Sequence, residues 1–210
     1  MKYKIHSFRY YASDYYGNGK ELFSNEQEFL PLWKEIQTTL DSIKDEELIL
    51  YYNNSTRSSK KSISDAINFL INERLCELGW RPQSPIFNDA DYKSNGKRSR
   101  WTLDFAKDTI SVEVAFNHGE AVAWNLIKPV LASELNHIEK AIQTKAGVII
   151  TATKSMKKAG NLDGAAGTYE KYLQYLNPFR NILTVPLVII GLEPPESFII
   201  NKKTKEVELL

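Results

Sequence analysis

Two neighbouring segments alternate apolar and polar residues without a break, and this alternation constrains the fold more than any other feature. Residues 100–106 read R-W-T-L-D-F-A and residues 109–116 read T-I-S-V-E-V-A-F. Because successive side chains of a strand point to opposite faces of a sheet, each segment predicts a strand with one apolar and one polar face. The short interval between them predicts a hairpin. Its polar face carries Asp104 and Glu113, and we expect this face to be open to solvent.

The turn of this hairpin decides how closely the two acids approach. A turn at Lys107 and Asp108 pairs Asp104 with Ser111 and leaves Glu113 on the diagonal, roughly 7 Å away between backbones. A turn one residue later places the two acids directly opposite each other. Either register keeps both carboxylates on one face, whereas a one-residue slip would separate them and expose an apolar row. The hairpin is a candidate cation site; the alternative is two solvated acids on the wet side of a half-exposed hairpin.

Composition limits the class of protein. The 210 residues are 42% hydrophobic and 25% charged, which is ordinary for a soluble globular protein, and we expect one domain over residues 1–210. The net charge of +1 argues against a protein that coats nucleic acid non-specifically, but it allows a local basic groove. The sequence has no apolar run of membrane-spanning length and no signal-peptide pattern, so we expect a cytoplasmic protein without a membrane partner.

The remaining pattern alternates helices and strands. Apolar residues at helical spacing predict helices over residues 25–42, 62–78 and 169–176, and a long helical region over 120–145 that is interrupted or restarted at Pro129. Strands are predicted over residues 2–11, 47–52, 146–153 and 186–191, with a terminal hairpin within 198–210 and loops over 53–61 and 80–99. Apolar strands separated by helices imply an α/β fold, with a mixed central sheet flanked by helices on both faces.

The acid pair also indicates a type of chemistry. Two carboxylates on adjacent strands, in a chain with one cysteine and no zinc-like Cys/His cluster, suit a hard cation such as Mg²⁺. A divalent cation can polarise a phosphoryl oxygen and lower the pKa of an attacking water. The pattern therefore favours phosphate chemistry.

The stretch L-D-F-A-K-D-T-I-S-V-E-V-A-F resembles the acidic hairpin of the PD-(D/E)XK nucleases, and specifically that of BglII/BstYI-like type II restriction endonucleases. Further segments follow in similar order over roughly residues 66–191: A-I-N-F-L-I-N-E-R-L with G-W, S-E-L-N-H, I-I-T-A-T-K, T-Y-E and P-L-V-I-I-G. The resemblance implies a restriction-endonuclease-like fold. It also implies a Mg²⁺-dependent enzyme that hydrolyses both strands of a short palindromic DNA site, possibly centred on GATC, and leaves 5′-phosphate ends.

The resemblance assigns roles residue by residue. Asp104 and Glu113 correspond to the catalytic, metal-binding carboxylates, with the backbone carbonyl of Val114 as a further ligand for one or two Mg²⁺ ions. Asn117 and His118 occupy the short segment that would enter the major groove and contact bases or phosphates. Outside this context, His118 would be interpreted as a surface turn residue.

The chain departs from the family pattern at Ala115. The family usually places Lys, Gln or Glu two residues after the second acid, and an alanine can neither orient water nor neutralise charge. A helix could supply the missing group. Our first candidates are Asn68 and Glu73 on the polar side of the 62–78 helix, followed by Lys128 and Glu134. For each of them the alternative is an ordinary polar residue on a helix surface.

The expected partners follow from the expected substrate. A palindrome calls for a two-fold symmetric reader, so we expect double-stranded DNA and a second copy of the chain, with a DNA methyltransferase acting on the same site but not bound. Lys154, at the end of a predicted strand, is a candidate DNA-backbone contact or a solvated lysine. Two other functions stay open: a DNA-binding protein with weak or no cleavage, which Ala115 would explain, and a nuclease for repair or modified DNA.

Overall fold

The computed structural model describes the whole chain except residues 13–14, 19–22, 56–61, 93–100 and 135–136. Within the described residues, seven strands form a mixed sheet in the order β2-β1-β7-β6-β5-β4-β3. Strands β5, β6 and β7 are parallel, and the other neighbours are antiparallel. The strand bounds are β1 (Tyr3–Ala12), β2 (Tyr15–Asn18), β3 (Arg81–Pro85), β4 (Thr102–Lys107), β5 (Ile110–Val114), β6 (Ala146–Ala152) and β7 (Leu187–Leu192). A separate terminal hairpin pairs β8 (Phe198–Ile200) with β9 (Val207–Leu209).

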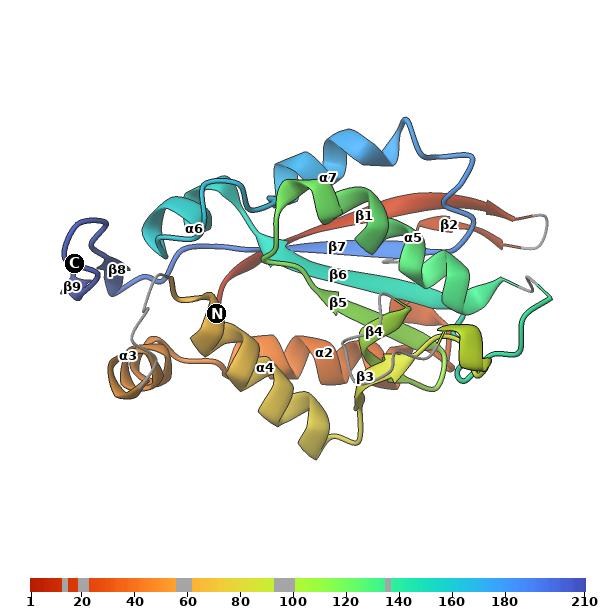
Figure 1. Cartoon of the computed structure of the whole chain (residues 1–210), viewed down its shortest axis with the longest axis horizontal. Coiled ribbons are helices and arrows are strands. Elements are labelled where there is room, and N and C mark those ends of the chain that lie inside the picture. Colours follow the sequence, from red (N-terminus) through yellow and green to blue (C-terminus); the bar gives the residue numbers. More distant parts are fainter. Residues whose placement is uncertain (13–14, 19–22, 56–61, 93–100, 135–136) are drawn as a thin grey trace.

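Helices cover both faces of the large sheet (Figure 1). Helices α2 (Leu30–Ser42), α3 (Asp45–Asn54) and α4 (Ser64–Glu77) lie on one side, and α5 (Val122–Ser133) and α7 (Tyr169–Leu176) lie on the other. Short helices α6 (Lys154–Ala159), η1 (Ala90–Tyr92) and η2 (Gly119–Ala121) connect these elements. The predicted α/β fold with a mixed, helix-flanked central sheet is confirmed.

The central strand β6 shows why the sheet needs two helical layers. Every residue of β6 is buried. Val148 and Ile150 belong to the apolar cluster that includes α2 and α4, whereas Ile149 belongs to the cluster of α5 and α7. A strand that is apolar on both faces is typical of a parallel sheet covered on both sides.

The acidic hairpin adopts the register that places the acids closest together. Lys107 pairs with Ile110 and Phe105 with Val112, so the two-residue turn is formed by Asp108 and Thr109. Asp108 has a φ of 45°, in the left-handed region that aspartate tolerates better than most residues. The direct register is confirmed, and the diagonal one is wrong.

The strand predicted over residues 47–52 is wrong, because these residues lie in α3. The helix opens on three acids that interact favourably with its N-terminal dipole: Asp45, Glu46 and Glu47. The Glu47 carboxylate also accepts a hydrogen bond from the backbone N–H of Lys44 at 3.0 Å, as in a capping box. Leu48 and Tyr52, one turn apart, are the buried residues of this helix. Helix-start chemistry therefore outweighs the local strand propensity.

Three other boundaries differ from the prediction. The helix predicted over 120–145 runs through Pro129 without the predicted interruption and ends at Ser133. After this end, the backbone N–H of Thr144 donates back to the carbonyl of Ala132 at 3.2 Å. The helix predicted from residue 25 begins at Leu30. The loop predicted over 80–99 contains η1 and the edge strand β3, in which Pro82 pairs with Phe105; an edge strand tolerates proline.

The other predicted elements have the predicted type, although most of their ends differ by one or two residues. They are the strands within 2–11, 146–153 and 186–191, the helix over 62–78, the helix over 169–176, and the terminal hairpin. The 62–78 helix ends before Gly79, whose φ of 83° only glycine adopts readily. Most of the loop predicted over 53–61 lies outside the described residues. None of the described helices is long and apolar enough to span a membrane.

Candidate active site

Asp104 and Glu113 are tied to each other's strands. Oδ2 of Asp104 accepts a hydrogen bond from the backbone N–H of Val114 at 2.9 Å, and Oε1 of Glu113 accepts one from the backbone N–H of Asp104 at 3.3 Å. Because each carboxylate is held by an amide of the opposite strand, neither can rotate away without losing a hydrogen bond. The structure therefore brings together the two acids that the alternation predicted.

The sequence pattern predicted that the face carrying these acids is open to solvent, but in the structure most of this face is covered. Glu113 is only 2% exposed, and its neighbours on the same face, Ser111 and Ala115, are buried as well. Helix α5 covers this face and approaches the sheet closely at Gly147, where an added Cβ would lie 2.5 Å from Cβ of Pro129. The other acid, Asp104, is half-buried. The interpretation of Glu113 as a solvated surface acid is therefore wrong.

A lysine from α5 pairs with the buried acid. Nζ of Lys128 lies 2.6 Å from Oε2 of Glu113, and the two side chains are 11% and 2% exposed. Burial and the nearby charge of Asp104 raise the pKa of Glu113, while the Lys128 ammonium opposes this rise. Two carboxylates so close together repel each other, and a positive charge beside them reduces that repulsion.

A second polar residue of α5 links this region to the loop after β5. Nδ2 of Asn125 lies 2.7 Å from the hydroxyl of Tyr172 and 3.3 Å from Oδ1 of Asn117. Burial raises the pKa of Tyr172, and the charges of Glu113 and Asp104 add to this effect. Tyr172 therefore lies within electrostatic reach of the acid pair.

The sequence interpretation missed Asn125 and gave Lys128 only a secondary place. Their signal in the sequence is their spacing, because residues three apart on a helix share a face. Both polar residues are buried on a helix whose other buried residues are apolar. Two polar residues on the buried face of an apolar helix indicate partners on the element it covers.

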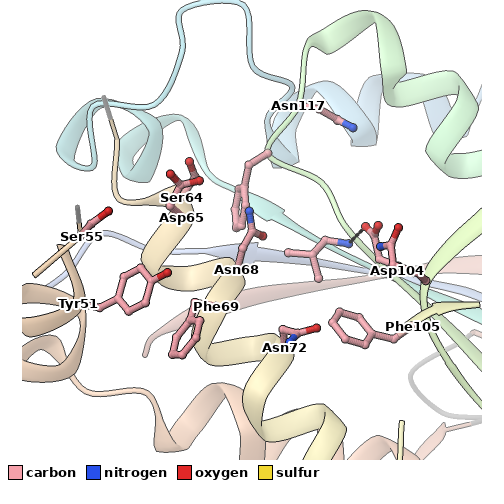
Figure 2. Close-up of a pocket in the computed structure, with 13 residues that line it drawn as sticks. Tyr51, Ser55, Ser64, Asp65, Asn68, Phe69, Asn72, Asp104, Phe105 and Asn117 are labelled. Atoms are coloured by element: carbon pink, nitrogen blue, oxygen red, sulfur yellow. Dashed lines mark hydrogen bonds between the residues drawn. The ribbon is translucent and has the colours of Figure 1, made fainter. Parts of the chain in front are cut away.

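A cavity of about 800 Å³ opens beside Asp104. Helix α4 faces Asp104 across this cavity, as Figure 2 shows, and presents Asn68 and Asn72 to it. The ring of Phe69 stacks on that of Tyr51 with centroids 4.5 Å apart at the same wall. The remaining lining residues are Ser55, Ser64, Asp65, Gln83, Phe105, Val114, Phe116 and Asn117. A concave site with a few polar groups around a carboxylate is typical of a binding or catalytic site.

The helix residues considered as replacements for the functional group missing at Ala115 lie in different places. Asn68 lines the cavity from α4. Glu73, on the same helix, is exposed and is not among the described residues that line it. Glu134 is the exposed C-cap of α5. Of the candidates, Lys128 alone forms a hydrogen bond to one of the two acids among the described contacts.

The predicted DNA-contact residues lie after β5 and at the start of α6. Asn117 is exposed and lines the cavity, and His118 is exposed and forms a β-bridge with Ala166. Lys154 is exposed at the first turn of α6, and its backbone N–H donates to the Glu170 carboxylate at 3.0 Å. Neither His118 nor Lys154 lines the cavity in the part of the chain that the structure describes.

The donor set of the acid pair fits a hard divalent cation. It offers carboxylate oxygens from Asp104 and Glu113, and oxygen ligands are those that Mg²⁺ prefers. No group of three or more His, Cys, Asp or Glu side chains suited to a metal is found among the described residues. A cation would also relieve the repulsion between the two carboxylates.

Comparisons with solved structures identify the class of this fold. The chain is similar to the restriction endonuclease BglII complexed with a DNA 16-mer, with a TM-score of 0.64, 21% sequence identity, and coverage of 99% of this chain and 87% of that chain. It is also similar to free BglII, with a TM-score of 0.55, 20% identity, and coverage of 95% and 83%. The fold is therefore that of a restriction endonuclease. A comparison with curated protein sequences gives no match.

The sequence itself identifies the family. The family model described as restriction endonuclease BglII/BglIII matches residues 11–192. The chain belongs to this family, and it is accordingly a type II site-specific deoxyribonuclease. The matched segment includes the acid pair, Lys128, and the loops that carry Asn117 and His118.

Proposed function

We propose that this chain is a Mg²⁺-dependent restriction endonuclease of the PD-(D/E)XK type, acting as one domain over residues 1–210. Its substrate is a short palindromic site in double-stranded DNA, and it hydrolyses both strands. The observation that carries this proposal is the pair of cross-tied carboxylates, Asp104 and Glu113, beside a polar cavity.

The acid pair supplies the ligands for the cation. Asp104, Glu113 and the backbone carbonyl of Val114 would hold one or two Mg²⁺ ions. When bound, Mg²⁺ polarises the scissile phosphate and lowers the pKa of the attacking water. The water oxygen forms a bond to phosphorus as the bond to the 3′-oxygen breaks, and a proton passes to that oxygen. The products are a 5′-phosphate and a 3′-hydroxyl.

Other residues position the substrate. Asn68 lines the cavity opposite Asp104, where its amide can donate a hydrogen bond to a phosphate oxygen or the attacking water. Exposed Asn117 and His118 follow β5 and supply base or phosphate contacts, and exposed Lys154 contacts the DNA backbone. Glu73, exposed away from the described cavity lining, has no part in this version of the site.

The biological setting follows from the substrate. A palindromic site is read by a homodimer, because the two half-sites are related by a two-fold axis. We propose a GATC-centred sequence as the first to be tested. A companion DNA methyltransferase that modifies the same sequence, without binding this protein, would protect the host DNA.

The acid pair is tested by substitution. Purified protein is incubated with unmethylated plasmid and Mg²⁺, and the fragments are separated and their ends sequenced. Asp104→Ala and Glu113→Ala should each lower the cleavage rate on the order of a thousandfold, because each removes a charge that acts on the transition state. The matched control is Asp108→Asn, which changes an exposed acid in the turn of the same hairpin and keeps a residue type that tolerates its φ of 45°.

The cleavage products distinguish the proposed function from the two alternatives. Discrete fragments with 5′-phosphate ends support restriction, whereas retarded but intact DNA supports a binding protein that does not cut. A smear, or cleavage of modified DNA only, supports a nuclease with another role. If either alanine variant cuts as fast as the Asp108→Asn control, the site assignment is wrong.

A further inference from the structure

The starting point is the absence of a functional group at Ala115. This residue follows Glu113 by two positions on the same face of β5, but its side chain is a methyl group and is 2% exposed. It packs in one apolar cluster with Val122 and Leu126 of α5. Helix α5 therefore packs against Ala115, and a side chain of this helix can reach Glu113 on the same face.

The close approach of α5 brings Lys128 to the acid. An added Cβ at Gly147 would lie within 2.5 Å of Cβ and 2.6 Å of Cγ of Pro129, so β6 and α5 are in direct contact at the residue that follows Lys128. Nζ of Lys128 then lies 2.6 Å from Oε2 of Glu113. A longer residue at position 115 or 147 would push the helix outward and lengthen this contact.

The resulting contacts fix the Glu113 carboxylate at both oxygens. Oε1 accepts from the backbone N–H of Asp104 and Oε2 accepts from Lys128. Burying an ion pair costs desolvation energy that a well-packed apolar pair would not incur. The buried Lys128–Glu113 pair therefore points to a use for its charges beyond stability.

We propose that Lys128 is a positioning residue of the nuclease site: from α5 it holds the Glu113 carboxylate in place and supplies the positive charge that Ala115 cannot. This inference rests on the proposed function of the acid pair. The charge of Lys128 allows two carboxylates to be kept at one site, and it offsets part of the negative charge that accumulates when a phosphate enters.

The test uses the full-length protein and three measurements: single-turnover cleavage with Mg²⁺, DNA affinity without divalent cations, and the thermal midpoint. Lys128→Met removes the charge but keeps most of the stem. We expect its cleavage rate to fall about a hundredfold or more, with DNA affinity within a few-fold of the parent. Lys128→Arg, which keeps the charge, should recover most of the lost rate. A purely structural lysine would not separate cleavage from binding in this way.

A matched control separates this role from the loss of an ion pair in general. Lys107, at the end of β4, lies 2.8 Å from Glu35, and these side chains are also largely buried. Lys107→Met should lower the thermal midpoint but leave the cleavage rate within a few-fold.

Three results would overturn the inference. The first is cleavage by Lys128→Met within a few-fold of the parent. The second is a parallel loss of rate, DNA affinity and thermal midpoint in Lys128→Met, while Lys128→Arg fails to recover the rate. The third result applies if Lys128→Met does not fold, and it is full activity of Lys128→Gln. This variant keeps a hydrogen-bond donor to Glu113 but lacks the charge. Failure of the proposed function would give a different result, because Asp104→Ala would then cut as well as the parent.

Discussion

At the scale of single residues, the site depends on how a buried carboxylate is compensated. A charge removed from water costs several kcal/mol unless partners replace the lost solvation. Glu113 has a donor at each oxygen, one from the backbone of Asp104 and one from Lys128. Strand alternation predicted Glu113 and Asp104, because each lies on the polar side of the two-residue repeat of its own strand. It could not predict the lysine partner, because that contact depends on how a helix fifteen positions later packs on the sheet.

The same reasoning applies to Asn125, whose amide lies 2.7 Å from the Tyr172 hydroxyl. Tyr172→Phe removes this partner and leaves a buried amide with one fewer hydrogen bond. We expect a loss of about 1 to 2 kcal/mol in the free energy of unfolding, measured by urea denaturation. Tyr175→Phe on the same helix, where the ring packs edge-on against Phe179, is the matched control and should change stability less. Equal effects in the two variants would argue against a structural role for the Asn125 contact.

At the scale of elements, the predictions succeeded where one physical signal dominated and failed where two competed. The continuous apolar run of β6 and the amphipathic pattern of α7 each allowed one interpretation, and both are confirmed. The segment at α3 contains strand-forming residues, but its acidic first turn and its capping contact at Lys44 favour a helix. The end of α5 could not be read from periodicity, because the hydrogen bond from Thr144 to Ala132 returns the chain to the helix only in the folded protein.

The contact between α5 and β6 is an element-scale property that one substitution tests. Gly147→Ala would place a Cβ 2.5 Å from Pro129 and 2.8 Å from Leu187, so the helix or the strand must move. Overpacking of this kind costs about 1 to 3 kcal/mol, and the movement should also lower the cleavage rate, because Lys128 precedes Pro129. Thermal and urea denaturation measure the first effect, and plasmid cleavage measures the second.

Gly164→Ala is the control for this substitution, because no atom lies within 4 Å of its added Cβ. It should leave both stability and cleavage close to those of the parent. A Gly147→Ala variant that is as stable and active as the Gly164→Ala control would show that α5 tolerates displacement. In that case the position of Lys128 does not depend on this contact.

At the scale of the whole molecule, the site lies where three different segments of the chain meet. The β4–β5 hairpin carries the acids, α5 covers them and supplies the lysine, and α4 forms the opposite wall of the cavity. All three segments lie within residues 11–192, which the family model matches. Their meeting could not be predicted from periodicity, which gives the face of an element but not its neighbour. The sequence therefore ranked Asn68 above Lys128, whereas the packing places Asn68 at the cavity and Lys128 on Glu113.

The assembly of the whole molecule can be tested at the outer side of α5. Ile127 is half-buried on this helix, next to Lys128, and belongs to none of the three apolar clusters found among the described residues. If α5 contributes to the proposed dimer, Ile127→Asp buries an unpaired charge in the interface and weakens association roughly tenfold or more. Sedimentation velocity measures this change.

The pattern of DNA cleavage gives an independent measure of the same interface. A dimer on a palindrome cuts both strands in one binding event, so the parent should convert supercoiled plasmid mainly to the linear form. The Ile127→Asp monomer should accumulate nicked circles instead. Leu50→Asp on α3, where the side chain is 63% exposed, is the matched control and should behave like the parent. If Ile127→Asp sediments and cuts like Leu50→Asp, α5 is not the dimer contact. If the parent is itself a monomer that nicks DNA, the proposed homodimer is wrong. The argument for a palindromic site then fails as well.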